Sequence, residues 1–158
     1  MSEISSLVHG LGKRLGRNHL TLSTAESCTG GMIGHFLTNE PGSSEWYKGG
    51  IVAYSNTLKR DILNVEESVF VSYGAVSSQC VQSMAMGVAA LTKSDISAAV
   101  SGIAGPGGGT DEKPVGTVFI AWKIKDDVLW EKNVFQGNRL EIKFQAALKA
   151  ISVLYEKV

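Results

Sequence analysis

The sequence contains few of the residues that mark disulfide-rich or metal-binding proteins. It has only two cysteines, Cys28 and Cys80, which are far apart and form no CxxC motif. Such sparse cysteine use excludes a disulfide scaffold and is typical of a reducing compartment, so we expect a cytoplasmic protein. The three histidines are dispersed, and none lies at ligand spacing from another histidine, a cysteine or a carboxylate. We therefore expect no metal site, and no cofactor is expected either.

Net charge and long apolar runs are also absent. Fifteen basic and fifteen acidic residues cancel, so there is no overall attraction to nucleic acid or to an anionic membrane. The apolar runs are shorter than a membrane span, and the N-terminus lacks the basic and apolar regions of a secretory signal. We expect neither a nucleic-acid partner nor a membrane. The 158 residues are 44% hydrophobic, which predicts one globular domain over residues 1–158 with a sizeable core.

Helical and strand-like patterns alternate along the chain, which predicts an α/β fold. Apolar spacing and capping residues favour helices over 4–17, 31–38, 56–63, 66–71, 78–91 and 139–156, with Ser55 or Asn56 and Ser77 or Ser78 as caps. Apolar runs favour strands over 20–25, 50–54, 96–100, 115–124 and 128–136. The last two strands flank the turn 125–127 and predict an antiparallel hairpin. We therefore expect a three-layer α/β/α sandwich with a mixed sheet.

The segment 24–31 reads Thr-Ala-Glu-Ser-Cys-Thr-Gly-Gly and lies between a predicted strand and a predicted helix. Glycine has no Cβ to block a ligand, and a helix start offers free N–H groups to an oxyanion. Ser27 is therefore either a nucleophile beside its own oxyanion donors or a helix cap, and the pattern leaves both open. Cys28 is a rival nucleophile, but no histidine is near it in the sequence, which favours a small buried residue.

A second candidate group follows the strand predicted at 50–54. Lys59 is either a solvated surface charge or a desolvated amine with a lowered pKa, able to act as a base toward a serine. Tyr54 could orient this lysine or donate a hydrogen bond to a substrate. Because α/β sheets bind ligands at the carboxyl ends of their strands, the position of both residues favours a functional role.

The loop 102–114 contains five glycines among thirteen residues. Bare N–H groups of such a loop can surround a phosphate or carboxylate, and Ser101 and Thr110 add hydroxyls. The alternative is a flexible connection, although its length favours function. The loop is neither a P-loop nor a dinucleotide fingerprint, since GK[ST] is absent and a strand follows it. Arg139 lies at the start of the last predicted helix. Either Arg139 and the N–H groups of this helix end bind a phosphate together, or Asn138 is the N-cap of the helix and Arg139 is a surface residue.

Taken together, these motifs resemble the CinA C-terminal domain family, the nicotinamide-nucleotide (NMN) amidohydrolases. The resemblance extends from about Leu20 to the last helix, and the order of the motifs makes it specific. The matching stretches are 24–31, 50–56 with Lys59, 74–77, 101–106 and 113–118. The chain differs from the family pattern at Asn138, where aspartate is usual, and at Lys143, where a second arginine is common.

The resemblance implies a three-layer CinA C-terminal domain-like fold, a homodimer, and a small-molecule nucleotide as substrate. It implies hydrolysis of the carboxamide of nicotinamide mononucleotide to nicotinate mononucleotide and ammonia, without a metal, in pyridine nucleotide salvage. In the family pattern, Ser27 is the nucleophile, Lys59 its base and Tyr54 a partner of that pair. The substrate-binding residues it implies are Cys28, Thr29, Gly30 and Gly31 near the oxyanion, Ser101, Gly102, Gly105, Gly107 and Thr110 around the nucleotide, and Arg139.

Two alternatives use the same residues differently. The altered segment 137–139 together with the anion-suited loops is compatible with a non-catalytic module that binds a nucleotide without turnover. A serine hydrolase acting on a different amide or ester would share the chemistry and differ only in its pocket.

Overall fold

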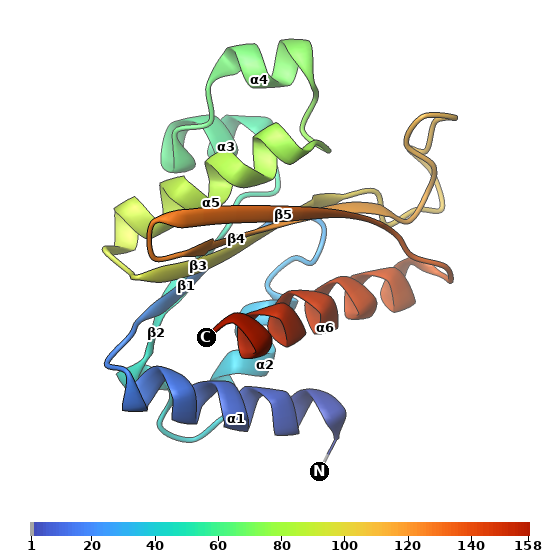
Figure 1. Cartoon of the computed structure of the whole chain (residues 1–158). Coiled ribbons are helices and arrows are strands. Elements are labelled where there is room, and N and C mark those ends of the chain that lie inside the picture. The colour runs from blue at the N-terminus through green and yellow to red at the C-terminus, as the bar shows by residue number, and fades with distance from the viewer. Residues whose placement is uncertain (1) are drawn as a thin grey trace.

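The computed structural model describes residues 2–158, which form one five-stranded sheet with helices on both faces (Figure 1). The strands lie in the order β2-β1-β3-β4-β5. Their bounds are β1 Leu22–Glu26, β2 Tyr47–Val52, β3 Ile96–Gly102, β4 Thr117–Ile124 and β5 Asp127–Val134. Strands β2, β1 and β3 are parallel, whereas β4 and β5 are antiparallel, so the predicted mixed sheet is confirmed.

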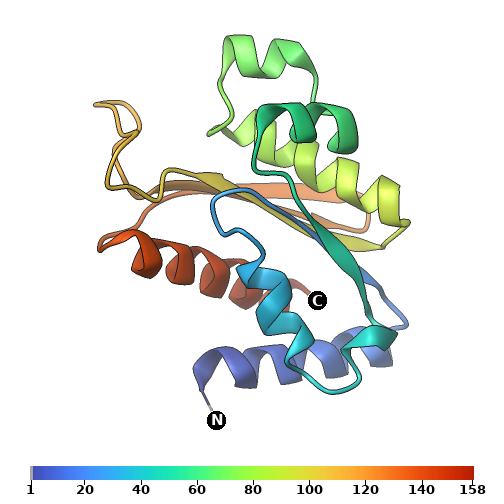
Figure 2. The same ribbon diagram turned by 180° about the vertical axis from the view of Figure 1, so that it is seen from behind.

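The helices divide between the two faces of the sheet, as both views show (Figure 1, Figure 2). One layer holds α1 Glu3–Arg17, α2 Met32–Thr38 and α6 Arg139–Lys157. The other holds α3 Asn56–Leu63, α4 Glu67–Ser72 and α5 Ser78–Thr92. The three-layer α/β/α architecture predicted from the alternating patterns is therefore confirmed. Within residues 2–158, no helix is both long enough and apolar enough to cross a bilayer.

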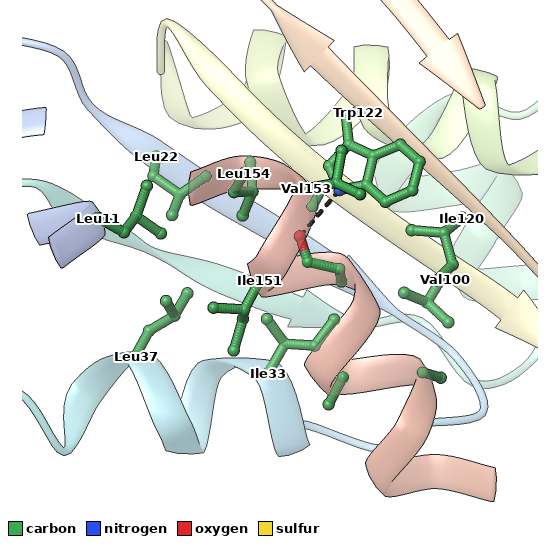
Figure 3. Packing of buried hydrophobic residues seen from close by; sticks show 14 of the residues in the cluster. Leu11, Leu22, Ile33, Leu37, Val100, Ile120, Trp122, Ile151, Val153 and Leu154 are labelled. Carbon is green, nitrogen blue, oxygen red and sulfur yellow. Dashed lines mark hydrogen bonds between the residues drawn. The ribbon is translucent and has the colours of Figure 1, made fainter. Parts of the chain in front are cut away.

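The larger apolar core lies between the sheet and the layer of α1, α2 and α6 (Figure 3). Trp122 on β4 is fully buried there, and its indole N–H donates a 3.0 Å hydrogen bond to the Ala150 carbonyl of α6. Val100 and Ile120 face the same side from adjacent strands. A second core under α3 and α5 includes Ala25 and Ala99. Alternate residues of the central strands thus serve opposite cores, because successive strand side chains point to opposite faces.

The strand order creates a crevice at one edge of the sheet. From β1 the chain passes to β2 on one side, and β3 then pairs with β1 on the other side. The connections after β1 and β3 therefore diverge at the carboxyl ends of these parallel strands. Open α/β sheets bind ligands at such a switch point, because the diverging loops leave room between them.

Some predicted boundaries require correction. Strand β2 spans Tyr47–Val52 instead of 50–54, because residues with little apolar character pair with β1 along this edge of the sheet. Strand β4 begins at Thr117 instead of residue 115. Gly116 takes a φ of +96°, and a Cβ there would meet the Phe135 carbonyl oxygen, so a bend precedes the strand. The short 3₁₀ helix Ser43–Glu45 was not predicted, whereas Ser55 and Ser77 are identified as the caps of α3 and α5.

Candidate active site

A cavity of about 300 Å³ lies at the carboxyl ends of β1, β2 and β3. Its wall draws on the turn after β1, the start of α3, the segment before α5, the glycine-rich loop and the first residue of α6. The sequence-predicted residues that line it are Ser27, Cys28, Tyr54, Lys59, Ser101, Gly102, Gly105, Gly107 and Arg139. Segments up to 112 residues apart (139 − 27) therefore meet at the switch point of the sheet.

Ser27 lies where the chain leaves β1. Its N–H donates a 3.0 Å hydrogen bond to the Val100 carbonyl, which extends the pairing of β1 with β3 by one residue. Only 8% of Ser27 is exposed, yet the residue lines the cavity. Its hydroxyl forms no hydrogen bond within residues 2–158, and because no fully buried side-chain oxygen or nitrogen there lacks a partner, this hydroxyl is open to the cavity. The position suits a hydroxyl that meets a ligand.

Ser27 does not cap the following helix, so that alternative is wrong. The N-cap of α2 is Gly31, which makes no side-chain hydrogen bond. The N–H groups of Ile33 and Gly34 are instead bonded to the carboxylate of Glu26, at 2.9 Å and 3.0 Å. Gly30 and Gly31 take φ values of +61° and +102°, conformations that favour glycine and that turn the chain from the sheet into α2.

Ser101 lies beside Ser27 on the neighbouring strand. Glu26 pairs with Val100 in the parallel ladder, so the next residues of the two chains, Ser27 and Ser101, are in register. In-register residues of parallel strands point to the same face, here the face of α3 and α5. Only 2% of Ser101 is exposed, and the residue lines the cavity. Its hydroxyl forms no hydrogen bond within residues 2–158 and, like that of Ser27, is not fully buried. The cavity thus receives two adjacent hydroxyls.

Lys59 on α3 brings an amine into the same cavity. Only 2% of the residue is exposed, so the interpretation as a solvated surface charge is wrong. Its Nζ donates a 3.0 Å hydrogen bond to the Tyr54 carbonyl. Burial lowers the pKa of this amine from its ordinary value, and the nearby thiols of Cys80 and Cys28 offset that effect in part. No carboxylate contacts Nζ among residues 2–158, so no ion pair there holds the amine in its charged form.

Tyr54 contributes two groups that face in different directions. Its main-chain carbonyl accepts the hydrogen bond from Lys59, whereas its hydroxyl accepts a 3.2 Å hydrogen bond from Arg139. The Arg139 guanidinium also donates a 2.7 Å hydrogen bond to the Gly105 carbonyl. Arg139 therefore ties the glycine-rich loop to Tyr54 at the exposed side of the cavity, and it places a positive charge there.

The two cysteines are buried near Lys59. Burial raises the pKa of Cys28 to about 12 and that of Cys80 to about 11. Both thiols are therefore protonated at neutral pH, and a thiol is a poor nucleophile in that form. The geometry favours a packing role for Cys28, although its edge lines the cavity.

Thr29, Gly30, Gly31 and Thr110 do not line the cavity. The buried Thr29 hydroxyl donates a 2.6 Å hydrogen bond to Glu26, and the two glycines form the turn behind Ser27. Thr110 closes the tip of the loop, where its hydroxyl accepts a 3.0 Å hydrogen bond from the Lys113 N–H. Lys143 of α6 reaches the turn that follows Ser27, since its Nζ would lie 3.6 Å from a Cβ at Gly30.

Several cavity residues were not singled out from the sequence. Asn56 begins α3, and Ala75, Val76, Ile103, Ala104 and Gly108 complete the wall. Ile103, Ala104 and Gly108 belong to the glycine-rich loop that the sequence predicted as an anion site. Ala75 and Val76 are small apolar residues without a chemical signal, and only the position of Asn56 after a strand end hinted at its role. Among residues 2–158, no group of three or more histidine, cysteine or carboxylate side chains is arranged to hold a metal ion.

These features define the class of protein: a single mixed-sheet α/β/α unit whose buried serine and lysine share one cavity at the strand ends. The sequence model of the CinA C-terminal domain matches residues 4–158, and the chain belongs to that family. Its relatives include the nicotinamide-nucleotide amidohydrolase PncC of Pseudomonas putida, which is 42% identical over 156 residues, covering 99% of this chain and 98% of that protein.

Other relatives are longer. A CinA-like protein of Thermotoga neapolitana is 50% identical over 140 residues, which cover 89% of this chain but only 34% of that protein. The chain therefore spans about a third of the length of several curated relatives that it matches. Among solved structures, the competence damage-inducible protein A of Klebsiella pneumoniae superposes with a TM-score of 0.95 at 35% identity, covering 99% of this chain and 97% of that one.

Proposed function

We propose that this protein is an amidohydrolase that converts nicotinamide mononucleotide to nicotinate mononucleotide and ammonia, without a metal, in pyridine nucleotide salvage. The observation that carries the proposal is the cavity itself, because Ser27 and Lys59, both largely shielded from solvent, line the same cavity. Similarity along nearly the whole chain to the nicotinamide-nucleotide amidohydrolase of P. putida supports amide hydrolysis of this substrate.

Lys59 is the proposed base. Because burial lowers its pKa, a larger fraction of the amine is neutral at a given pH than for an exposed lysine. The neutral amine takes the proton of Ser27 while Oγ attacks the carboxamide carbon. As the C–N bond breaks, the Lys59 ammonium returns that proton to the leaving nitrogen, which departs as ammonia. Water then attacks the acyl-enzyme, restores the Ser27 hydroxyl and releases the carboxylate product.

The developing oxyanion needs donors close to Ser27. The Gly30 N–H already donates to the Ser27 carbonyl at 3.1 Å, and the N–H groups of Ile33 and Gly34 are bonded to Glu26. Among residues 2–158, the N–H group of Cys28, which directly follows Ser27 and belongs to a residue that lines the cavity, donates to no oxygen acceptor. The N–H after a nucleophilic serine is a frequent oxyanion donor, so we assign this role to the Cys28 N–H.

Arg139 and the glycine-rich loop form the proposed nucleotide end of the cavity. The Arg139 guanidinium provides charge-assisted donors, and Gly105, Gly107 and Gly108 leave the backbone open to a phosphate. Ser101 and Asn56 add polar groups to the wall of the same cavity. This arrangement suits a substrate with an amide at one end and an anionic group at the other.

The decisive experiment measures ammonia release from nicotinamide mononucleotide in the presence of a chelator. Unaltered protein is expected to release ammonia, Ser27→Ala to release none, and Ser152→Ala on α6, which lies away from the cavity, to match the unaltered protein. Equal turnover by Ser27→Ala would refute the mechanism. Nucleotide binding by calorimetry without ammonia release would favour the non-catalytic binding module instead.

We propose that the protein is a homodimer, as the family resemblance implies, and that it is cytoplasmic, as its sparse use of cysteine indicates. Light scattering should then give about twice the chain mass of 16.8 kDa, and a monomer mass at all concentrations would contradict the dimer.

A further inference from the structure

Glu26 is the last residue of β1 and one of the most deeply buried charged side chains in the protein, with 2% of its surface exposed. Burial of a carboxylate costs free energy unless hydrogen bonds compensate. No lysine, arginine or histidine forms an ion pair with it within residues 2–158. The cost of burying the Glu26 carboxylate is therefore offset entirely by hydrogen bonds from uncharged donors.

All three donors belong to the segment that follows the proposed nucleophile. The Thr29 hydroxyl and the Ile33 N–H donate to Oε1 at 2.6 Å and 2.9 Å, and the Gly34 N–H donates to Oε2 at 3.0 Å. Ile33 and Gly34 are the second and third residues of α2, whose N–H groups an N-cap side chain normally satisfies. Glu26 performs this capping from the other side of the turn.

The backbone of Glu26 is held as firmly as its side chain. Its carbonyl accepts a 2.9 Å hydrogen bond from the Ala53 N–H, and the next N–H, of Ser27, donates to Val100 at 3.0 Å. The hydrogen bonds of Glu26 and of the following N–H thus connect the end of β1 with Val100 of β3, with Ala53 directly after β2, and with α2. The turn between these anchors contains two glycines with positive φ, and glycine restricts the backbone least.

We propose that Glu26 is the positioning residue of the oxyanion site, holding the turn so that the free N–H group of Cys28 meets the substrate carbonyl oxygen. The inference rests on the proposed function of Ser27. Glu26 also occupies the N–H groups of Ile33 and Gly34, which leaves the Cys28 N–H as the available donor at the cavity. Glu26 itself does not touch the substrate, since it does not line the cavity.

The first test is Glu26→Gln, which keeps the size of the side chain but replaces one acceptor oxygen with a donor. That donor must face either the Gly34 N–H or the Thr29 and Ile33 donors, so the turn shifts. Because complete loss of one oxyanion donor costs about 10²–10³ in rate, we expect kcat to fall roughly 10- to 100-fold with KM changed less than about threefold. Glu40→Gln, at a carboxylate paired with His9 away from the cavity, is the matched control and should retain full activity.

A second pair of variants separates positioning from folding. Thr29→Ser keeps the hydroxyl that bonds to Glu26, whereas Thr29→Val removes it at nearly constant volume. We expect Thr29→Ser to retain kcat within about threefold and Thr29→Val to lose about tenfold in kcat. A folded Glu26→Gln with unchanged kcat, a loss confined to KM, or equal effects of Thr29→Ser and Thr29→Val would overturn the proposal.

A readout independent of the nucleotide keeps the two proposals distinguishable. A fluorophosphonate reagent forms a bond from phosphorus to the Ser27 oxygen with loss of fluoride, and its labelling rate depends on the same oxyanion donor. Labelling of unaltered protein without ammonia release would refute the proposed substrate alone, and the variants would be ranked by labelling. Slower labelling of Glu26→Gln and Thr29→Val than of Thr29→Ser would support the positioning role. Absence of labelling in folded, unaltered protein would overturn both.

Discussion

At the scale of single residues, the proposed chemistry depends on a lysine where apolar side chains are usual. Lys59 is 2% exposed, and the only hydrogen bond of its side chain within residues 2–158 goes to the Tyr54 carbonyl. Burial lowers the pKa of Lys59 because a charged amine is poorly solvated there. The burial that would prepare this amine to act as a base therefore works against the stability of the folded state.

Replacement of Lys59 by methionine should abolish turnover and stabilise the fold. The folded-state pKa is below that of the unfolded chain, so the penalty is present at neutral pH and disappears as pH rises toward the ordinary lysine value of about 10.4. We expect the Tm of Lys59→Met at pH 7 to exceed that of unaltered protein by a few degrees, with a smaller difference at pH 10. Calorimetry at both pH values checks this, and a lower Tm at pH 7 would contradict it.

The pH dependence of kcat should also distinguish the two groups of Tyr54. Activity should rise along an acid limb as Lys59 loses its proton, with a midpoint below the ordinary lysine pKa. Tyr54→Phe keeps the carbonyl that bonds to Lys59 and removes the hydroxyl that bonds to Arg139. We expect Tyr54→Phe to leave the midpoint of the acid limb unchanged and to raise KM severalfold. Rates measured between pH 5 and pH 10 check this. A shifted limb would assign the hydroxyl to the Ser27–Lys59 pair.

At the scale of elements, the site depends on how closely helix α5 approaches the end of α3. A Cβ at Gly87 of α5 would lie 2.0 Å from the Leu63 carbonyl oxygen, at the last residue of the helix that carries Lys59. The missing side chain therefore lets the two helices touch. Without this contact, α3 would stand further from the cavity.

Two Gly→Ala substitutions in helices should consequently have opposite effects. Gly87→Ala forces α3 away from α5, so we expect it to lower Tm and to reduce kcat through displacement of Lys59. Gly16→Ala in α1 meets no atom within 4 Å, so the better helix propensity of alanine should stabilise by about 0.5–1 kcal/mol. Thermal unfolding and ammonia release measured side by side test the pair. Equal effects of the two variants would show that packing at Gly87 is not limiting.

At the scale of the whole molecule, one sheet serves two cores. Trp122 lies in the larger one and is bonded to the Ala150 carbonyl of α6, the helix whose first residue is Arg139 (Figure 3). The packing of this helix therefore connects the centre of the molecule with the nucleotide end of the cavity.

Trp122→Phe should weaken the whole fold while leaving the site nearly intact. The smaller ring leaves a cavity and removes the donor to Ala150, so we expect a loss of about 2–4 kcal/mol in the free energy of unfolding. Because both cores share one sheet, circular dichroism and the fluorescence of the remaining tryptophans should follow a single unfolding transition in urea. Separate transitions for the two probes would show that the two layers unfold independently.

The sequence alone determined the layered α/β architecture and most element positions, and it pointed to the segments that carry the candidate site residues. These inferences succeeded because apolar periodicity, capping serines and glycine-rich turns act over a few residues, as at Ser55 and Ser77. The roles of Ser27 and Lys59 stay predictions; their positions at strand ends were visible in the sequence, whereas their meeting in one cavity was not. The boundary at β2 was wrong because pairing across the sheet outweighed local apolar content, and that at β4 was wrong because a bend at Gly116 precedes the strand.

Only the tertiary structure decided which groups of these segments face one another. It buried Lys59, turned the Tyr54 hydroxyl to Arg139 and its carbonyl to the lysine, and made Glu26 the cap of α2 in place of Ser27. These outcomes depend on the register of β1 against β3 and on the approach of helices distant in sequence. Such contacts are settled by packing across the whole chain, so no local pattern contains them.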